Sequence, residues 1–270
     1  MHEVVHVVPL GFEIDRAAAP FESGLVANRV RILTILDTKR DADWNRQQQT
    51  YLAAVQERLR ARRIKVTVED VDTFDLQQLM SAVSRIIIEE RAKQNDVFVN
   101  IAAAGKLQAL GASLASMAHG VKLYYVEAEE YSLSKREREE HGLSRSAGKV
   151  RYLASIPFAL PNAKGMRILA ELAARPEGLS TEDLLEALRR SGVQGFGTSS
   201  KATRLQRTNY LMKLNKGVLE PLEKAGYLTH REKIGRQKWI RVTPAGMMIA
   251  SLSGLEPVLR PRVGERGRPS

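Results

Sequence analysis

The chain has 270 residues, 43% of them hydrophobic, a formal net charge of +11 and no cysteine, which excludes disulfides, thiolate zinc sites and a cysteine nucleophile. This length exceeds the usual size of one domain, so we expect two domains, each with its own core. The sequence has no run of eighteen apolar residues and no basic region at its N-terminus. We therefore expect neither a membrane span nor a signal peptide, and we expect a cytoplasmic protein.

Short apolar runs alternate with longer amphipathic stretches through residues 1–156. The runs predict strands at 3–8, 30–36, 64–71, 96–102, 121–126 and 150–156. The periodic stretches predict helices at 43–62, 74–93 and 106–118, the last with a core-facing stripe of Leu107, Leu110, Leu114 and Met117. Strands that alternate with helices favour a mostly parallel sheet covered on both faces, so we expect an α/β, Rossmann-like domain over residues 1–156.

The segment NDVFVNIAAAGKLQA, residues 95–109, runs an apolar strand into a turn of small residues and then into a helix that carries Lys106. In α/β sheets, such a turn lets a ligand reach the free backbone N–H groups at the helix start, where the helix dipole favours negative charge. The pattern predicts a phosphate site. The alternative, that the alanines only allow close packing of helix on sheet, remains open.

A dinucleotide-dependent enzyme is a rival interpretation, with Asp37 at the end of the second predicted strand as the ribose contact. The segment after the first strand, PLGFEIDR, has one glycine instead of GxGxxG, and the chain contains no GxxxxGK[ST]. We therefore expect no cofactor. We also expect no catalytic residue and no metal site, and we interpret His2 and His6 as structural.

Residues 127–149 interrupt the alternation with eleven charged side chains in 23 residues. We expect a surface excursion or a short exposed helix there, either a solvated connection or a lid over the strand ends. Pro157 and Pro161 then indicate a linker over residues 157–162. A second domain is expected at 163–255, and the tail at 256–270, rich in proline and arginine, is expected to be disordered.

The excess positive charge lies in the second half of the chain. Residues 1–150 carry 21 basic and 21 acidic residues, whereas residues 151–270 carry 21 basic and 10 acidic residues. The pattern there predicts helices at 163–174, 181–192 and 199–225, and the second of these is opened by the capping pair Ser180 and Asp183. A hairpin with strands at 227–233 and 238–244 follows, and then a last helix at 247–252. This order is that of a winged helix-turn-helix, which together with the charge indicates binding to double-stranded DNA.

The basic residues coincide with the elements that such a domain uses on DNA. We expect Lys201, Arg204 and Arg207 to lie on the side of the third helix away from Leu211 and to enter a major groove. Glu220 and Glu223 would repel phosphate, so we place the recognition surface in the N-terminal half of that helix. The remaining candidates are Ser199 and Ser200 as helix caps and phosphate ligands, Asn209 as a base reader, and Arg231, Lys233, Arg236, Lys238 and Arg241 on the hairpin. Protein–protein contact is the alternative role for this fold.

The chain resembles archaeal transcriptional regulators that join a CARF-like domain (CRISPR-associated Rossmann fold) to a winged helix. This resemblance covers nearly all of residues 1–250. The opening HEVVHVVPLGFEIDR and the segment NIAAAGK, residues 100–106, carry the resemblance. Asn100, Gly105 and Lys106 match the family pattern, whereas Ala103 and Ala104 stand where it usually has glycines.

The resemblance implies a homodimer that binds a cyclic oligoadenylate, most often the tetra-adenylate, between two facing strand-end sites. By that carry-over the ligand site would contain Gly11, Phe12, Asn100, Ala104, Gly105 and Lys106, with Thr38 as a further member. We therefore expect a ligand-responsive transcriptional regulator that is not an enzyme. The alternatives are an enzyme that degrades cyclic oligoadenylate, and a constitutive DNA-binding dimer without a ligand.

Overall fold

The computed structural model divides the chain into two compact units, residues 1–159 and 160–270, and each is described by itself. The structure describes residues 2–36, 42–156, 158–196, 203–229, 232–234 and 237–255. The predicted tail at 256–270 lies outside these ranges. Within them, no helix combines the length and the apolar character needed to cross a membrane.

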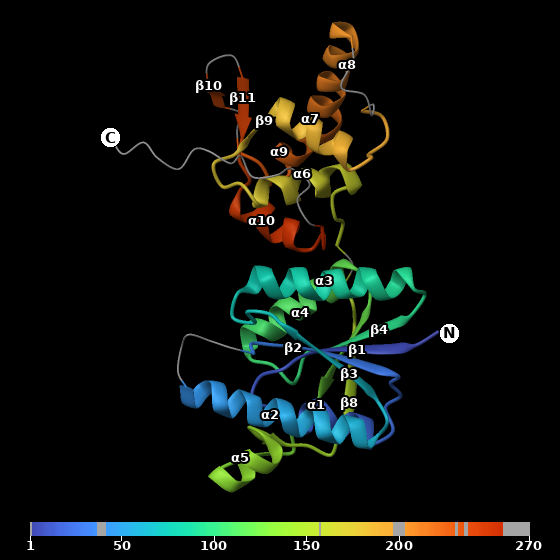
Figure 1. The fold of residues 1–270 in the computed structure, drawn as a ribbon, viewed down its shortest axis with the longest axis vertical. Coiled ribbons are helices and arrows are strands. Elements are labelled where there is room, and N and C mark those ends of the chain that lie inside the picture. The colour runs from blue at the N-terminus through green and yellow to red at the C-terminus, as the bar shows by residue number, and fades with distance from the viewer. Residues whose placement is uncertain are drawn as a thin grey trace. The chain divides into compact units, whose positions relative to one another are not determined.

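The first unit is built on a six-stranded sheet with the order β3-β2-β1-β4-β5-β8 (Figure 1). The first five strands along the chain run parallel, and β8 pairs with β5 in the antiparallel direction. The strands are β1 (Val4–Pro9), β2 (Arg29–Thr34), β3 (Lys65–Asp70), β4 (Asp96–Asn100), β5 (Lys122–Val126) and β8 (Val150–Leu153). The predicted Rossmann-like fold is confirmed, and its crossover places the ends of β1 and β4 side by side.

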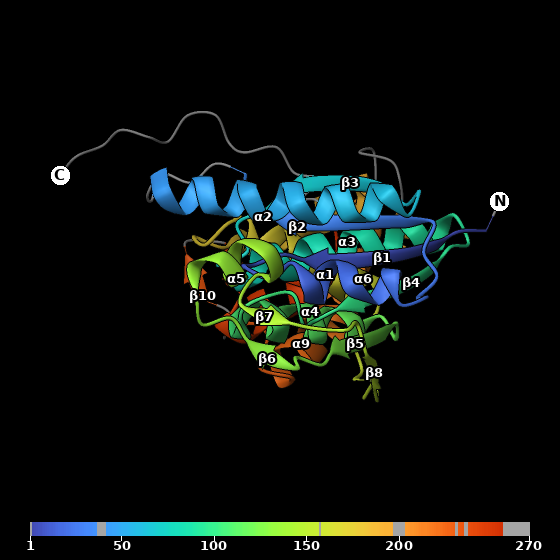
Figure 2. The same ribbon diagram turned by 90° about the horizontal axis from the view of Figure 1, so that it is seen from below.

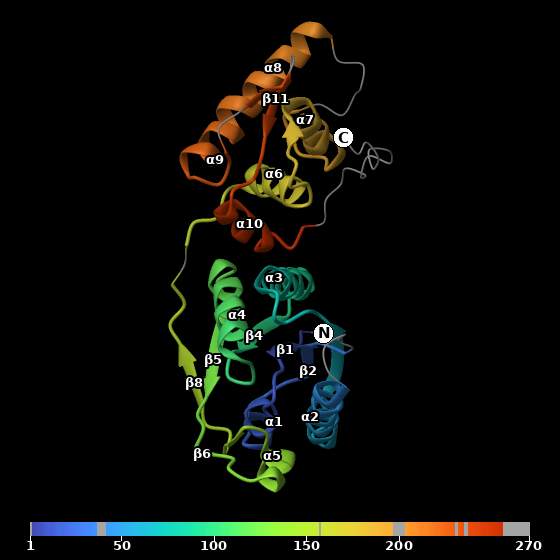
Figure 3. The same ribbon diagram turned by 90° about the vertical axis from the view of Figure 1, so that its left-hand side faces the viewer.

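Helices cover both faces of this sheet (Figures 1 and 3). On one face lie α1 (Asp15–Glu22) and α2 (Ala42–Ala61), and on the other lie α3 (Leu76–Ala92) and α4 (Lys106–Ala118). The sequence did not predict α1. It is eight residues long, and Phe21 is the one large apolar side chain among its seven buried residues, so it lacks the spaced large apolar residues that mark an amphipathic helix.

The predicted apolar stripe of α4 is wrong. Leu107 and Leu110 are 45% and 51% exposed, whereas the small residues Gly111, Ala112 and Ala115 are buried. A Cβ at position 111 would come within 2.7 Å of a methyl group of Leu76 on α3, so a side chain there would clash. Small residues bring α4 close to its neighbours, and Leu107 and Leu110 face outward.

Residues 127–149 form the predicted excursion beyond the sheet, which Figure 2 shows beside α1 and α2. It consists of β6 (Glu130–Tyr131), α5 (Lys135–His141) and β7 (Ser144–Arg145). The helix α5 buries none of its residues, as expected for an exposed helix. The residues that follow α5 return to the body of the unit and are anchored there, which excludes a merely solvated connection.

The second unit has the winged helix order that the sequence predicted. Its helices are α6 (Ala163–Ala173), α7 (Thr181–Arg190), a long third helix made of α8 (Arg204–Leu214), the π-helical turn η1 (Asn215–Leu219) and α9 (Glu220–Lys224), and finally α10 (Pro244–Ser251). The hairpin consists of β10 (Glu232–Ile234) and β11 (Gln237–Ile240), and the short strand β9 (Leu179–Ser180) pairs with β11. Ser180 and Asp183 cap α7 reciprocally, as predicted.

Candidate functional site

The loops after β1 and β4 meet backbone to backbone at the carboxyl end of the sheet. The N–H of Gly11 donates a hydrogen bond to the carbonyl oxygen of Ala103 at 2.8 Å. A Cβ at position 11 would already lie 3.5 to 3.6 Å from the backbone of residues 103–105. The structure thus brings Gly11 to Ala104, Gly105 and Lys106, which the sequence placed in one site.

This contact leaves the N-terminus of α4 open. Gly105 precedes the helix, and its N–H donates to Oε1 of Gln108, whose Nε2 donates to Oγ1 of Thr73 at 2.9 Å. No acceptor in the described part of the chain is bonded to the backbone N–H groups of Lys106 and Leu107. Gly105 and Lys106 are exposed, so two unpaired donors, the helix dipole and a lysine charge share one accessible place.

Asn100, Phe12 and Thr38 were also predicted to contact the ligand. Asn100 is completely buried; its Nδ2 donates to the carbonyl oxygen of Arg16 at 2.9 Å and its Oδ1 accepts from the N–H of Ala102 at 2.8 Å. Asn100 therefore shapes the turn and offers no surface to a ligand. Phe12 is half-buried, with its ring 5.5 Å from those of Trp44 and Tyr51. Thr38 lies outside the described residues.

The excursion is fastened to the loop that follows β1. The N–H of Leu143 donates to the carbonyl oxygen of Phe12 at 2.8 Å, and Glu13 pairs with Gly142 in an antiparallel bridge. Gly142 has φ +84°, and a Cβ there would come within 2.5 Å of the backbone nitrogen of Ile14. Glycine at this position therefore permits both the left-handed conformation and the close approach.

We call the contacts between residues 12–15 and residues 141–146 the latch. Two carboxylates, those of Glu13 and Asp15, take part in it. Glu13 is buried and accepts hydrogen bonds from the N–H of Ser144 at 3.2 Å and from its hydroxyl at 2.8 Å, and burial raises the pKa of this carboxyl group. Asp15 accepts from the N–H of Ser146 at 3.1 Å and contacts Nδ1 of His141 at 3.1 Å. No pattern in the sequence indicates these contacts, because the hydrogen bonds from Ser144 to Glu13 and from Ser146 to Asp15 join residues 131 positions apart.

His6 is buried and both of its ring nitrogens are hydrogen-bonded within the first unit, in keeping with the structural role expected from the sequence. Its Nε2 donates to the carbonyl oxygen of Val26 at 3.0 Å, and its Nδ1 accepts from the hydroxyl of Tyr124 at 3.1 Å. Burial lowers the pKa of His6 to about 4. Among the described residues, no group of three or more histidines and carboxylates has the arrangement of a metal site.

In the second unit, the third helix begins later than predicted. Its N-cap is Thr203, whose hydroxyl accepts a hydrogen bond from the N–H of Gln206. Residues 203–209 are all exposed, including Arg204 and Asn209. The predicted DNA contacts Ser199, Ser200, Lys201, Arg231 and Arg236 lie outside the described residues.

For Arg207 the predicted position away from Leu211 is wrong. Arg207 is exposed, but it is one turn before Leu211 on the same side of the helix, and it pairs with Glu182 of α7 at 2.8 Å. Lys213 and Lys216, which were not among the predicted DNA contacts, are both exposed on this helix. On the wing, Lys233 and Lys238 stand opposite each other in the ladder, and Nε of Arg241 donates to the carbonyl oxygen of Glu177 at 3.2 Å.

The fold and the two sites define a two-domain protein in which a Rossmann-like unit precedes a winged helix unit. Residues 4–131 match the family model described as HFX_2341-like, N-terminal, and residues 164–254 match the DUF6293 C-terminal winged helix domain. The two matches fall on the two parts of the chain for which the sequence predicted a Rossmann-like domain and a winged helix. No curated protein matches the chain.

The solved structures that match the chain share little sequence with it. Csm6 from Enterococcus italicus, bound to cyclic hexa-2'-fluoro-hexa-dAMP, is 14% identical with a TM-score of 0.42, over 82% of this chain and 57% of that one. Protein VC1899 from Vibrio cholerae is 12% identical with a TM-score of 0.40, over 92% and 64%. Can2 from Sulfobacillus thermosulfidooxidans, in complex with cyclic tetra-adenylate, is 13% identical with a TM-score of 0.36, over 91% and 63%. The chain spans less than two thirds of each of these proteins.

Proposed function

We propose that the chain is a ligand-responsive, DNA-binding transcriptional regulator whose first unit binds a cyclic oligoadenylate, with the tetra-adenylate as the first candidate. The observation that carries the proposal is the open N-terminus of α4. There the contact between Gly11 and Ala103 presents the free N–H groups of Lys106 and Leu107 beside the Lys106 charge. Such a place favours a phosphate group.

The proposed regulator is a homodimer held together by its first units. The outward leucines of α4 support this, because Leu107 and Leu110 lie one turn apart on the same helix and are about half exposed. Apolar side chains gathered on one helix face are typical of a protein–protein contact. A two-fold axis beside α4 would place two helix N-termini around one cyclic ligand, whose symmetry matches that of the dimer.

The second unit is proposed to bind double-stranded DNA. The winged helix domain, the positive charge of residues 151–270 and the exposed cations Arg204, Lys213 and Lys216 on the third helix support this role. In the proposed mechanism, ligand bound across the dimer axis changes the angle between the first units, and the linker at 157–162 passes that change to the spacing of the two DNA-binding helices. The protein is proposed to act without degrading its ligand.

Ligand binding is tested by calorimetry on the full chain with cyclic tetra-adenylate and cyclic hexa-adenylate. We expect one of them to bind the wild-type protein and Lys106→Ala to weaken it. Lys122→Ala is the matched control, because this exposed lysine lies at the opposite end of the sheet, at the start of β5. If Lys106→Ala and Lys122→Ala bind the ligand with equal affinity, the ligand does not bind at the N-terminus of α4. If the wild-type protein binds neither ligand, the alternative of a constitutive DNA-binding dimer is favoured.

The regulatory step needs a second measurement. Double-stranded DNA selected from a random pool is titrated with the protein, with and without saturating ligand. A ligand can shift DNA affinity only if it binds the two conformations unequally, so unchanged affinity would refute the coupling. Chromatography of the same mixtures detects linear oligoadenylate. If linear oligoadenylate forms, the protein is an enzyme that degrades its ligand, and the proposal that it acts without degrading the ligand is refuted.

A further inference from the structure

Three exposed side chains form a stripe along α8, on the side turned away from the core of the second unit. They are Leu205, Asn209 and Met212, and their spacings of four and three residues place them on one face of the helix. Leu205 is 72% exposed and Met212 is 50% exposed. The completely buried Leu214 follows Met212 by two residues, which is about 200° further around the helix axis. These three residues, the α8 stripe, therefore face outward.

The α8 stripe combines two large apolar side chains with one amide. A second amide nearby, that of Gln206, serves the helix cap, because its Oε1 accepts a hydrogen bond from the N–H of Thr203 at 2.9 Å. The exposed amide of Asn209 offers both a donor and an acceptor to a partner. From Leu205 to Met212 the helix rises by about 10 Å, which is the height of roughly three stacked base pairs.

The charge beside the α8 stripe is positive. Lys213 follows Met212 directly, Lys216 lies one turn after Met212, and both lysines are exposed. Neither lysine forms an ion pair with any residue that the structure describes. A polyanion that covers the stripe can therefore pair its own charges with these two cations.

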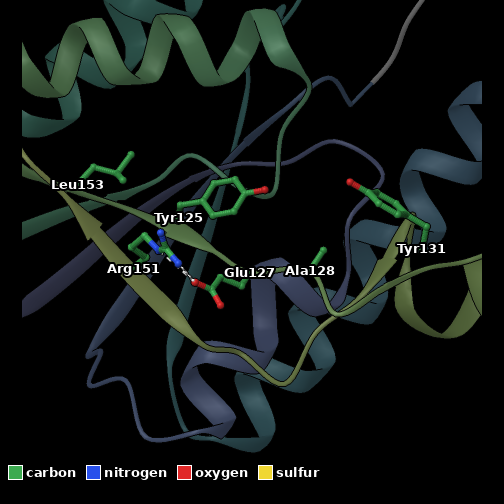
Figure 4. Close-up of a pocket in the computed structure, with 6 residues that line it drawn as sticks. All are labelled: Tyr125, Glu127, Ala128, Tyr131, Arg151 and Leu153. Carbon is green, nitrogen blue, oxygen red and sulfur yellow. Dashed lines mark hydrogen bonds and ion pairs between the residues drawn. The ribbon is translucent and has the colours of Figure 1, made fainter.

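Exposed apolar residues of the first unit have different surroundings. Tyr125 and Tyr131 line a pocket at the carboxyl end of β5, together with Glu127 and Arg151 (Figure 4). Oε1 of Glu127 accepts hydrogen bonds from Nε and Nη2 of Arg151 at 3.0 and 2.6 Å, so the positive charge of Arg151 is already paired within the unit. The comparison favours nucleic acid as the partner of the α8 stripe, because its neighbouring cations have no such carboxylate among the described residues.

We propose that the α8 stripe reads A·T base pairs in the major groove, with Asn209 bonded to an adenine and with Leu205 and Met212 against the methyl groups of thymines. The inference rests on the proposed DNA-binding function and extends it, because it names the bases that the third helix recognises. In the major groove an asparagine amide pairs with N6 and N7 of adenine. Of the four bases, only thymine presents a methyl group there to an apolar side chain.

The first experiment selects sites from a random pool of double-stranded DNA with the wild-type protein and with Asn209→Ala. We expect half-sites with a run of about three A·T pairs from the wild-type protein. Asn209→Ala should lose the preference for adenine at one position, where we expect the wild-type protein to discriminate roughly 5- to 150-fold. Selected wild-type sites without A·T pairs would overturn the inference and leave DNA binding standing. If the wild-type protein selects no site, the inference and the DNA-binding function are refuted together.

The second experiment replaces the thymines of a selected site by uracil, one at a time, which removes only the methyl group. We expect affinity to fall about 4-fold at each contacted thymine, as for the exposure of one buried methyl group. In Met212→Ala this effect should disappear at one thymine and persist at the thymine that Leu205 contacts.

Lys213→Ala is the matched control, because Lys213 is exposed beside Met212 but carries a charge for phosphate. It should weaken binding to every sequence alike, reduce the slope of log affinity against log salt by about 1, and keep the full uracil effect. Equal affinity of the wild-type protein for thymine and uracil sites would overturn the inference and favour a protein–protein contact for Leu205 and Met212.

Discussion

The buried His6 should make the first unit sensitive to acid. Its imidazole is 1% exposed and packs among the rings of Phe21, Phe98 and Tyr124, at centroid distances of 5.0 to 5.5 Å. Both ring nitrogens are hydrogen-bonded in the neutral form, and the pKa of about 4 lies below the value of 6.5 expected for the unfolded chain. Between these two values the unfolded chain binds more protons than the folded one, so the stability of the fold decreases as pH falls.

The size of this loss follows from the difference between the two pKa values. One pKa unit corresponds to about 1.4 kcal/mol, so His6 should cost the fold about 2 kcal/mol at pH 5 and about 3 kcal/mol at pH 4, relative to pH 8. The assay is urea unfolding of the full chain carrying Trp239→Phe, followed by the fluorescence of Trp44, the remaining tryptophan, which belongs to the first unit. In His6→Gln this part of the pH dependence should be absent.

His2→Gln is the control. The pKa of His2 is raised by its hydrogen bond to Asp96, so His2 contributes stability at low pH and its removal should have the opposite sign. The ring signals of histidine in NMR give the pKa of His6 directly. Titration of His6 near 6.5, or equal pH dependence in the wild-type protein and His6→Gln, would refute the argument from burial.

Three further variants test the dimer, the DNA interface and the latch. Leu110→Glu should convert the dimer to a monomer in analytical ultracentrifugation, whereas the control Leu133→Glu should leave the dimer intact. A wild-type protein that is already monomeric would contradict the proposed interface. Arg204→Ala should weaken DNA binding by roughly 1–3 kcal/mol and reduce the slope of log affinity against log salt by about 1, so an unchanged slope removes Arg204 from the interface. Gly142→Ala should destabilise the first unit by about 1–3 kcal/mol in thermal unfolding. Gly24→Ala, also at positive φ but with no atom within 4 Å of the new Cβ, should cost less, and equal costs would show that the close approach to Ile14 is unimportant.

The sequence predicts most of the fold because each strand of the sheet is an apolar run and each long helix has a clear period. Its errors have physical causes. On α4 the large apolar residues were expected inside, but close packing against α3 selects the small residues Gly111, Ala112 and Ala115 for the buried face. The third helix of the second unit begins at Arg204 because Thr203 provides the cap, a signal that the preceding serines obscured.

The candidate site was predictable only where it depends on local sequence. The turn of small residues and Lys106 indicated the helix N-terminus, and the order of the strands brings Gly11 to it. Asn100 matched a family pattern, but its hydrogen bonds to Arg16 and Ala102 use the side chain internally. The contacts of Glu13 with the excursion depend on tertiary structure alone, and no pattern within either segment indicates them.

The latch also imposes an order on the formation of the site. Glu13 and Asp15 leave the ribosome early, but the backbone groups of Ser144 and Ser146 that pair with them are 131 residues further along the chain. At the usual rate of synthesis, 5–20 residues per second, these carboxylates spend roughly 7 to 26 seconds in water before their partners exist. The loop that carries Gly11 and Phe12 is therefore among the first parts of the protein to be made and among the last parts of the first unit to take its final form.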